Sequence, residues 1–113
     1  MKEYNKENIK GHELEAVKED GYNIQFIENP SEELQLESIK YNGYVIEYIK
    51  NPSEEVQLEA VKYDGCAIKY IENPSKEVQL ASVKQDGWAI QFIKNPSEEL
   101  QSIAARNKNT FIF

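Results

Sequence analysis

Cysteine, histidine and excess basic charge are all scarce in this chain of 113 residues. It has one cysteine, one histidine, and 13 lysines and arginines against 20 acidic residues. A single cysteine cannot form a disulfide within the chain, which is typical of a reducing, intracellular setting. A net charge of −7 supplies no basic excess to displace counterions from a phosphate backbone, so we expect no direct nucleic-acid binding. Apolar runs are only a few residues long, and we expect no membrane partner.

Signals for targeting and for catalysis are missing as well. The stretch Met1–Glu7 lacks the apolar core of a signal peptide, so we expect a cytoplasmic protein, in the host cytoplasm if a phage encodes it. His12 has no cysteine or second histidine nearby, which argues against a metal site. Acid pairs such as Glu54–Glu55 recur in most units, so they belong to the scaffold rather than to a catalytic dyad. With no glycine-rich phosphate loop either, we expect no enzyme, metal or cofactor.

Proline and glycine, in contrast, recur with a fixed period. Each proline lies 22 residues after the previous one, and four of the five glycines share that step: Pro30, Pro52, Pro74 and Pro96, and Gly21, Gly43, Gly65 and Gly87. A fixed period of this size is the signature of a stacked-repeat protein, whose terminal units are often degenerate caps. We therefore predict one domain with an N-terminal cap (1–20), repeats 21–42, 43–64, 65–86 and 87–108, and a C-terminal tail (109–113).

The residues that favour helix starts and ends inside each unit predict two helices. In the second repeat, Asn51 is expected to cap a helix with Pro52 in its first position and Glu54 completing a capping box. This helix should end near Tyr63, before a glycine that we expect in the left-handed conformation. A shorter helix should span Tyr44–Lys50. The cation that suits the last turn of the longer helix recurs at Lys18, Lys40, Lys62, Lys84 and Arg106.

Two strand-based interpretations compete with this one. The stretch Trp88–Phe92 alternates like a strand, and Asn-Gly and Asp-Gly dipeptides also form hairpin turns. The segment Ile46–Asn51 partly imitates a leucine-rich repeat, whose period can also be 22. Against both, isoleucines recur three positions apart in each repeat, on one helical face, and the leucines that should follow the asparagine are absent. We therefore predict an all-α fold, a short α-solenoid of about four 22-residue two-helix repeats with degenerate capping units at both ends.

Polar positions inside the helices are expected to connect neighbouring repeats. The mid-helix glutamines should form a buried row whose amides bond the backbone or amide of an adjacent repeat: Gln35, Gln57, Gln79 and Gln101. The end of the shorter helix alternates in charge through Glu28, Lys50, Glu72 and Lys94, as does the pair Glu47 and Lys69. Stacking should therefore place opposite charges side by side and fix the register between near-identical units.

The positions that differ between repeats are the candidate binding residues. One row follows each glycine and the other lies two residues before it, and both contain the Tyr and Trp that anchor protein interfaces. We expect the two rows near one turn edge, with packing across repeat boundaries as the structural alternative. Together with the charged pair, the candidate partner-binding residues are Tyr22, Tyr41, Tyr44, Glu47, Tyr63, Cys66, Lys69 and Trp88.

The units also resemble a known repeat family. The stretches Gly65-Cys66-Ala67-Ile68-Lys69-Tyr70 and Glu77-Val78-Gln79-Leu80-Ala81-Ser82-Val83 are similar to a family of bacterial, viral and protist repeats known only as a domain of unknown function. The resemblance covers about residues 12–106. It implies an all-helical array and carries no activity or site residues.

Three functions remain open on the sequence alone. The leading prediction is a non-enzymatic module that binds another protein through a solenoid face. An alternative is a small acidic inhibitor, from a phage or mobile element, that blocks a nucleic-acid-handling defence protein by imitating phosphates. A third is a structural homo-oligomer, in which Phe111–Phe113 or an open end of the array docks onto another copy.

Overall fold

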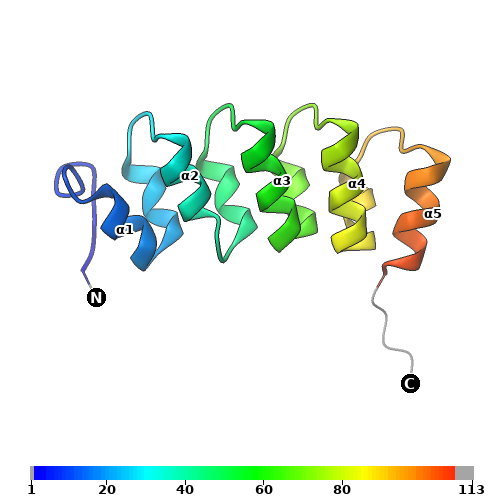
Figure 1. Ribbon diagram of the computed structural model, residues 1–113, viewed down its shortest axis with the longest axis horizontal. Coiled ribbons are helices and arrows are strands. Elements are labelled where there is room, and N and C mark those ends of the chain that lie inside the picture. The colour runs from blue at the N-terminus through cyan, green and yellow to red at the C-terminus, as the bar shows by residue number, and fades with distance from the viewer. Residues whose placement is uncertain (1, 109–113) are drawn as a thin grey trace, which may run out of the picture.

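The chain forms two layers of short helices, one built from α-helices and the other from 3-10 helices. The computed structural model describes residues 2–108 (Figure 1). The α-helices are α1 (Glu13–Glu19), α2 (Glu32–Ser38), α3 (Glu54–Tyr63), α4 (Lys76–Gln85) and α5 (Glu98–Arg106). The 3-10 helices are η1 (Gly21–Phe26), η2 (Gly43–Tyr48), η3 (Gly65–Tyr70) and η4 (Gly87–Phe92). No strand occurs within this described part, so the all-α prediction is confirmed and both strand interpretations are wrong.

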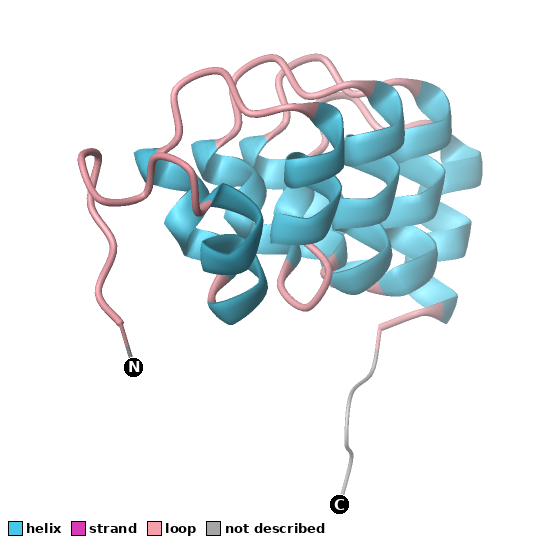
Figure 2. Cartoon of the chain, turned by 60° about the vertical axis from the view of Figure 1, so that its left-hand side comes forward, coloured by secondary structure: helices cyan, strands magenta, loops and turns pink. Residues whose placement is uncertain are grey.

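The helices stack in chain order as a short solenoid. Each α-helix packs against the next α-helix, and each 3-10 helix packs against the next 3-10 helix. The two layers run side by side along an array of 48 × 34 × 16 Å (Figure 2). None of the helices described is long and apolar enough to cross a membrane.

The α-helices of the repeats begin two residues later than predicted, because serine rather than asparagine caps them. In α3, the Ser53 hydroxyl accepts the Val56 N–H at 3.2 Å, and Pro52 precedes the helix. Asn51 instead has a φ of +48°, and all four equivalent asparagines lie in this left-handed region, which asparagine tolerates better than most residues. The predicted Asn cap, the Pro in the first helical position and the capping box are therefore wrong.

The shorter helices are 3-10 helices, and a side chain caps the start of three of them, η1, η2 and η4. At η3 the Asp64 side chain makes no such cap. In η2, the N–H of Tyr44 donates to Asn42 Oδ1 at 2.9 Å, a local bond that turns the chain before the i→i+3 pattern begins. The helix ends at Tyr48 rather than Lys50, and Ile49 is extended. Ile46 and Ile49 are nonetheless buried, as their spacing predicts.

The repeated glycines are needed for close packing and not for a left-handed turn. Gly21, Gly43, Gly65 and Gly87 all have negative φ, which corrects the predicted C-terminal role. A Cβ on Gly65 would lie 2.6 Å from the Ser82 carbonyl oxygen, and the other three would meet the equivalent carbonyl of the following α-helix even more closely. These glycines therefore set how near the two layers approach.

Buried side chains from both layers form one core along the array. Val56, Ala60 and Val61 of α3 are fully buried, and so is Ile46 of η2. A second, smaller cluster joins Tyr4 and other residues of the N-terminal cap to α1 and η1. The predicted tail 109–113, with Phe111–Phe113, lies outside the described residues.

Two predicted connections between repeats are not made. Each mid-helix glutamine donates to the proline carbonyl of its own repeat, as Gln57 does to Pro52 at 3.0 Å, instead of bonding a neighbouring repeat. Ion pairs among residues 2–108 join side chains three positions apart, as Lys62 and Glu59 do at 3.5 Å, and none joins the alternating charges of adjacent repeats. Lys40 also falls beyond α2, whereas the other four predicted cations lie in a last helical turn.

Candidate functional site

Large aromatic side chains are exposed on the layer of 3-10 helices. Tyr48, Tyr70 and Phe92 are the last residues of η2, η3 and η4, and they are 43%, 38% and 39% exposed. Trp88, the second residue of η4, is 45% exposed. We define the aromatic strip as these rings together with the side chains that support them: Tyr22, Tyr44, Tyr48, Lys69, Tyr70, Trp88 and Phe92.

Edge-to-face contacts hold the exposed rings across repeat boundaries. The Tyr22 and Tyr48 ring centres are 5.8 Å apart with the rings inclined at 80°. Tyr44 and Tyr70 repeat this contact one unit later, at 6.2 Å and 88°. In each pair, the ring that follows the glycine is half-buried and supports the exposed ring of the next repeat. Such pairs add about 0.5–1.5 kcal/mol beyond the area that they bury, so they help to hold the exposed rings of Tyr48 and Tyr70 in place.

One lysine lies over the centre of the strip. The Lys69 amine is 5.3 Å from the Tyr44 ring centre, 5.1 Å from that of Tyr70 and 5.8 Å from that of Phe92. Lys108 stands 4.6 Å over Trp88 at the other end. A cation within about 6 Å of a ring face is attracted by the ring quadrupole, which restrains a long side chain without removing its charge from the surface.

Cys66 replaces the supporting aromatic residue in the third repeat. Its thiol donates to Asp86 Oδ2 at 3.5 Å. Burial raises the pKa of the Cys66 thiol, and the charge and hydrogen bond of Asp86 raise it further. Burial is also the main reason that the pKa of the Tyr44 hydroxyl is raised. Both groups therefore stay protonated at neutral pH and are not primed to act as nucleophiles.

The eight predicted site residues do not share one surface. Tyr22, Tyr44, Glu47, Cys66, Lys69 and Trp88 all belong to the 3-10 layer. Tyr41, 84% exposed, lies between α2 and η2 and lines a hollow with Tyr22. Tyr63 is the last residue of α3 and lines a different hollow, together with residues of α2. Tyr41 and Tyr63, which belong to the predicted row two residues before each glycine, therefore line two different hollows.

The most regular row of exposed rings lies outside the predicted site residues. Tyr48, Tyr70 and Phe92 were not among the predicted site residues, although an aromatic residue follows each repeated glycine by five positions. The fourth member of this row, Phe26, is only partly exposed because it packs against Tyr4 and Ile9 of the N-terminal cap. Strict recurrence of a large aromatic residue was the signal that could have identified the row.

The α-helical layer presents an acidic surface instead. An open hollow of about 570 Å³, which we call the acidic hollow, is lined by residues of α2 and α3 with Lys40: Glu32, Glu33, Leu36, Glu37, Glu55, Glu59 and Tyr63. Lys40 lies 4.0 Å from Glu37, and Lys62 lies 3.5 Å from Glu59. The remaining glutamates give the hollow a negative surface.

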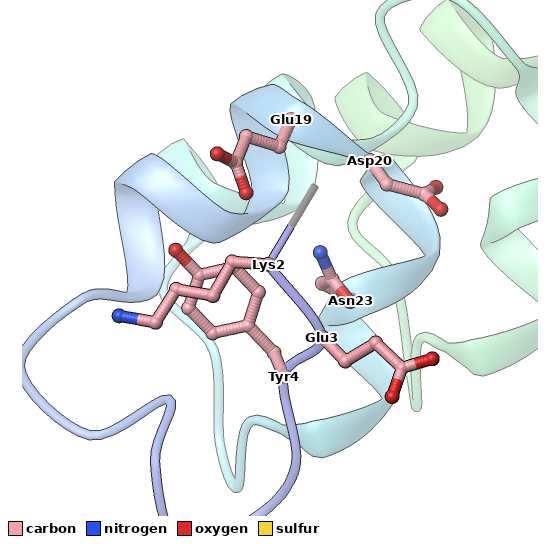
Figure 3. A pocket seen from close by; sticks show the side chains of 6 residues that line it. All are labelled: Lys2, Glu3, Tyr4, Glu19, Asp20 and Asn23. Atoms are coloured by element: carbon pink, nitrogen blue, oxygen red, sulfur yellow. The ribbon is translucent and has the colours of Figure 1, made fainter.

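A third feature lies at the N-terminal end of the array, where residues 2–4, the end of α1 and η1 line a hollow of about 470 Å³ (Figure 3). Tyr4 is buried there, and its ring lies 5.4 Å from the Lys2 amine. Burial raises the pKa of Tyr4, and the nearby Glu19 adds to this effect through its charge and a hydrogen bond. These contacts fasten the start of the chain to α1, so we assign the hollow a structural role.

Comparison with known proteins supports the family resemblance. No curated protein and no solved structure matches the chain. A family model does match residues 53–95, which contain α3, η3, α4 and η4 and thus nearly two repeat lengths. Over this stretch the chain matches the family described as a domain of unknown function, DUF4116.

Proposed function

We propose that this chain is a non-catalytic module that binds another protein through the aromatic strip. The observation that carries the proposal is the pair of edge-to-face tyrosine contacts, which fix exposed rings at the same place in successive repeats. Tyr and Trp are enriched among the residues that dominate binding energy, and rings that are already fixed lose little conformational entropy on binding.

Quantitative affinity capture with matched baits tests this proposal. The baits are the wild type, a strip variant (Tyr48→Ser with Tyr70→Ser) and a control variant in the acidic hollow (Glu32→Gln with Glu55→Gln). All four substituted side chains are exposed, and circular dichroism with urea unfolding checks that each bait is folded. We expect the strip variant to lose a captured protein by about tenfold or more, while the control keeps it. Equal capture by all three baits would contradict the proposal.

The acidic hollow supports a second candidate function, inhibition of a nucleic-acid-handling protein by imitation of phosphates. Glutamates from two helices converge there, and a basic groove on a partner would be attracted to them. The same baits separate the two candidates, because here the control variant and not the strip variant would lose the partner. Binding would also weaken steeply with salt and be competed by DNA.

A further inference from the structure

We propose that the aromatic strip takes an extended, proline-rich segment of the partner in the polyproline II conformation. A basic residue of that segment lies opposite Glu47, and an acidic residue three positions away lies opposite Lys69. This inference rests on the proposed function and names the chemistry of its ligand. It follows from the spacing of the rings, from their free hydroxyl groups and from the charges between them.

The spacing of the strip matches one turn of polyproline II. Packed helices generally lie about 8–10 Å apart, and η2, η3 and η4 pack in succession with one exposed last ring each, so we expect the rings to recur at about that interval. Polyproline II has three residues per turn and a rise of about 3.1 Å, so every third residue recurs after about 9 Å on the same side. A β-strand presents a side chain to one face about every 7 Å, and an α-helix does so about every 5 Å, so both would place side chains between the rings.

The exposed tyrosines also carry hydroxyl groups that are free to bind a ligand. Within residues 2–108, the hydroxyls of Tyr48 and Tyr70 make no hydrogen bond, whereas that of Tyr22 accepts one from Asn42 Nδ2 at 3.2 Å. Polyproline II leaves its backbone carbonyls unbonded. Proline rings can thus pack on the aromatic faces while tyrosine hydroxyls donate to these carbonyls, which is how aromatic surfaces recognise such segments.

The residue directly before the last aromatic residue of each 3-10 helix gives the strip its charge pattern. At the ends of the array this position is neutral, and Gln25 and Gln91 each donate to a carbonyl of their own helix at 3.0 Å. In the middle it is charged: Glu47 lies in η2 and Lys69 lies in η3, one repeat apart. Neither forms an ion pair within the described chain. Opposite charges three residues apart on the ligand complement this pair, since three residues span one repeat.

Titration of the full chain with four synthetic peptides tests the inference, and Trp88, the single tryptophan of the chain, reports binding by fluorescence. Three peptides are proline-rich and carry Arg–Asp, Arg–Arg or Asp–Asp three positions apart. The fourth has the Arg–Asp pair with glycine in place of proline. We expect the Arg–Asp proline peptide to bind best and the glycine version to bind about tenfold more weakly or worse, because glycine restores the chain freedom that proline removes.

The variant Lys69→Glu then tests the charge pairing. Glu47 occupies the same position in the preceding repeat, so the fold accommodates a glutamate there. In this variant the preferred ligand should change to the Arg–Arg peptide, by about two- to fivefold, the effect expected of exposed pairs. An unchanged preference, or equal binding of the glycine peptide, would overturn the inference.

Failure of this inference can be told apart from failure of the proposed function. If the strip variant loses the captured protein but no proline-rich peptide binds, the strip binds a partner of another conformation and only this inference fails. If capture does not depend on the strip, the proposed function fails as well.

Discussion

The two layers of the array arise from the same 22-residue unit but repeat in different ways. All four 3-10 helices have six residues and end in an aromatic ring, whereas the α-helices vary from 7 to 10 residues. The rings of the 3-10 layer contact one another across repeats. The ion pairs of α2 and α3 stay within one repeat, as Lys62 and Glu59 do.

This difference suggests where binding energy can accumulate. Exposed ion pairs within one helix contribute about 0–1 kcal/mol each and are screened by salt. Rings that brace one another across repeats form a more rigid surface, here over the first three repeats. We therefore propose the 3-10 layer as the binding surface and the α-helical layer as its support. Three perturbations test this division, one at the contact between the layers and one in each layer.

The largest effect is expected where the layers touch. In Gly43→Ala, the new Cβ would overlap the carbonyl oxygen of Ala60, which is backbone and cannot move cheaply. We expect the free energy of unfolding, measured with urea, to fall by about 3 kcal/mol. Gly11→Ala is the control, because nothing lies within 4 Å of its Cβ and only its φ of +83° opposes the change. That variant should lose about 1 kcal/mol, and equal losses would show that crowding is not the reason for the glycine.

A smaller effect is expected from the caps of the α-layer. Ser53→Ala removes the hydroxyl that accepts the Val56 N–H and should cost about 1 kcal/mol of unfolding free energy. Asn51→Gly keeps a residue suited to positive φ and should change stability by only a few tenths of a kcal/mol. Thermal and urea unfolding of both variants measure the difference. If the asparagine substitution is the costlier one, the assignment of serine as the cap is wrong.

The sequence was sufficient to predict the repeat, the all-helical fold and the buried face. Isoleucines three positions apart, such as Ile46 and Ile49, face the same side in both an α-helix and a 3-10 helix. For the same reason they could not distinguish the two kinds of helix. What the 3-10 helices share is the close approach of the following α-helix at their first glycine, as at Gly43, and this is a contact between elements distant in the sequence.

The choice of helix decides which aromatic row is exposed. At about 100° per residue, Tyr44 would lie roughly 170° from the buried isoleucine face and Tyr48 about 130° from it, so Tyr44 looks like the most exposed ring. At about 120° per residue, both lie about 120° from that face, on opposite sides. Contacts with neighbouring repeats then determine their exposure, and these leave Tyr44 half-buried and Tyr48 exposed. A single unit of the sequence does not contain this information.

The smallest effect concerns Cys66, which occupies the position of the supporting rings Tyr22 and Tyr44 in the third repeat. Because burial and Asp86 raise the pKa of its thiol, less thiolate is present at pH 8 and alkylation by iodoacetamide should be slower than for a free cysteine. Asp86→Asn removes the charge yet keeps a side chain able to cap η4, as Asn42 caps η2. We expect alkylation of Cys66 to become about two- to fivefold faster in this variant. Mass spectrometry of samples taken over time measures the rate.

Asp20→Asn, which changes the equivalent cap at η1, is the matched control and should leave the Cys66 rate unchanged. The raised pKa also has a consequence for stability, because the folded state holds its proton more tightly than the unfolded state does. The stabilisation is complete below the unfolded thiol pKa and is lost as pH rises through the folded one. If Asp86→Asn neither speeds alkylation nor reduces this loss, the Cys66 thiol does not sense the charge of Asp86.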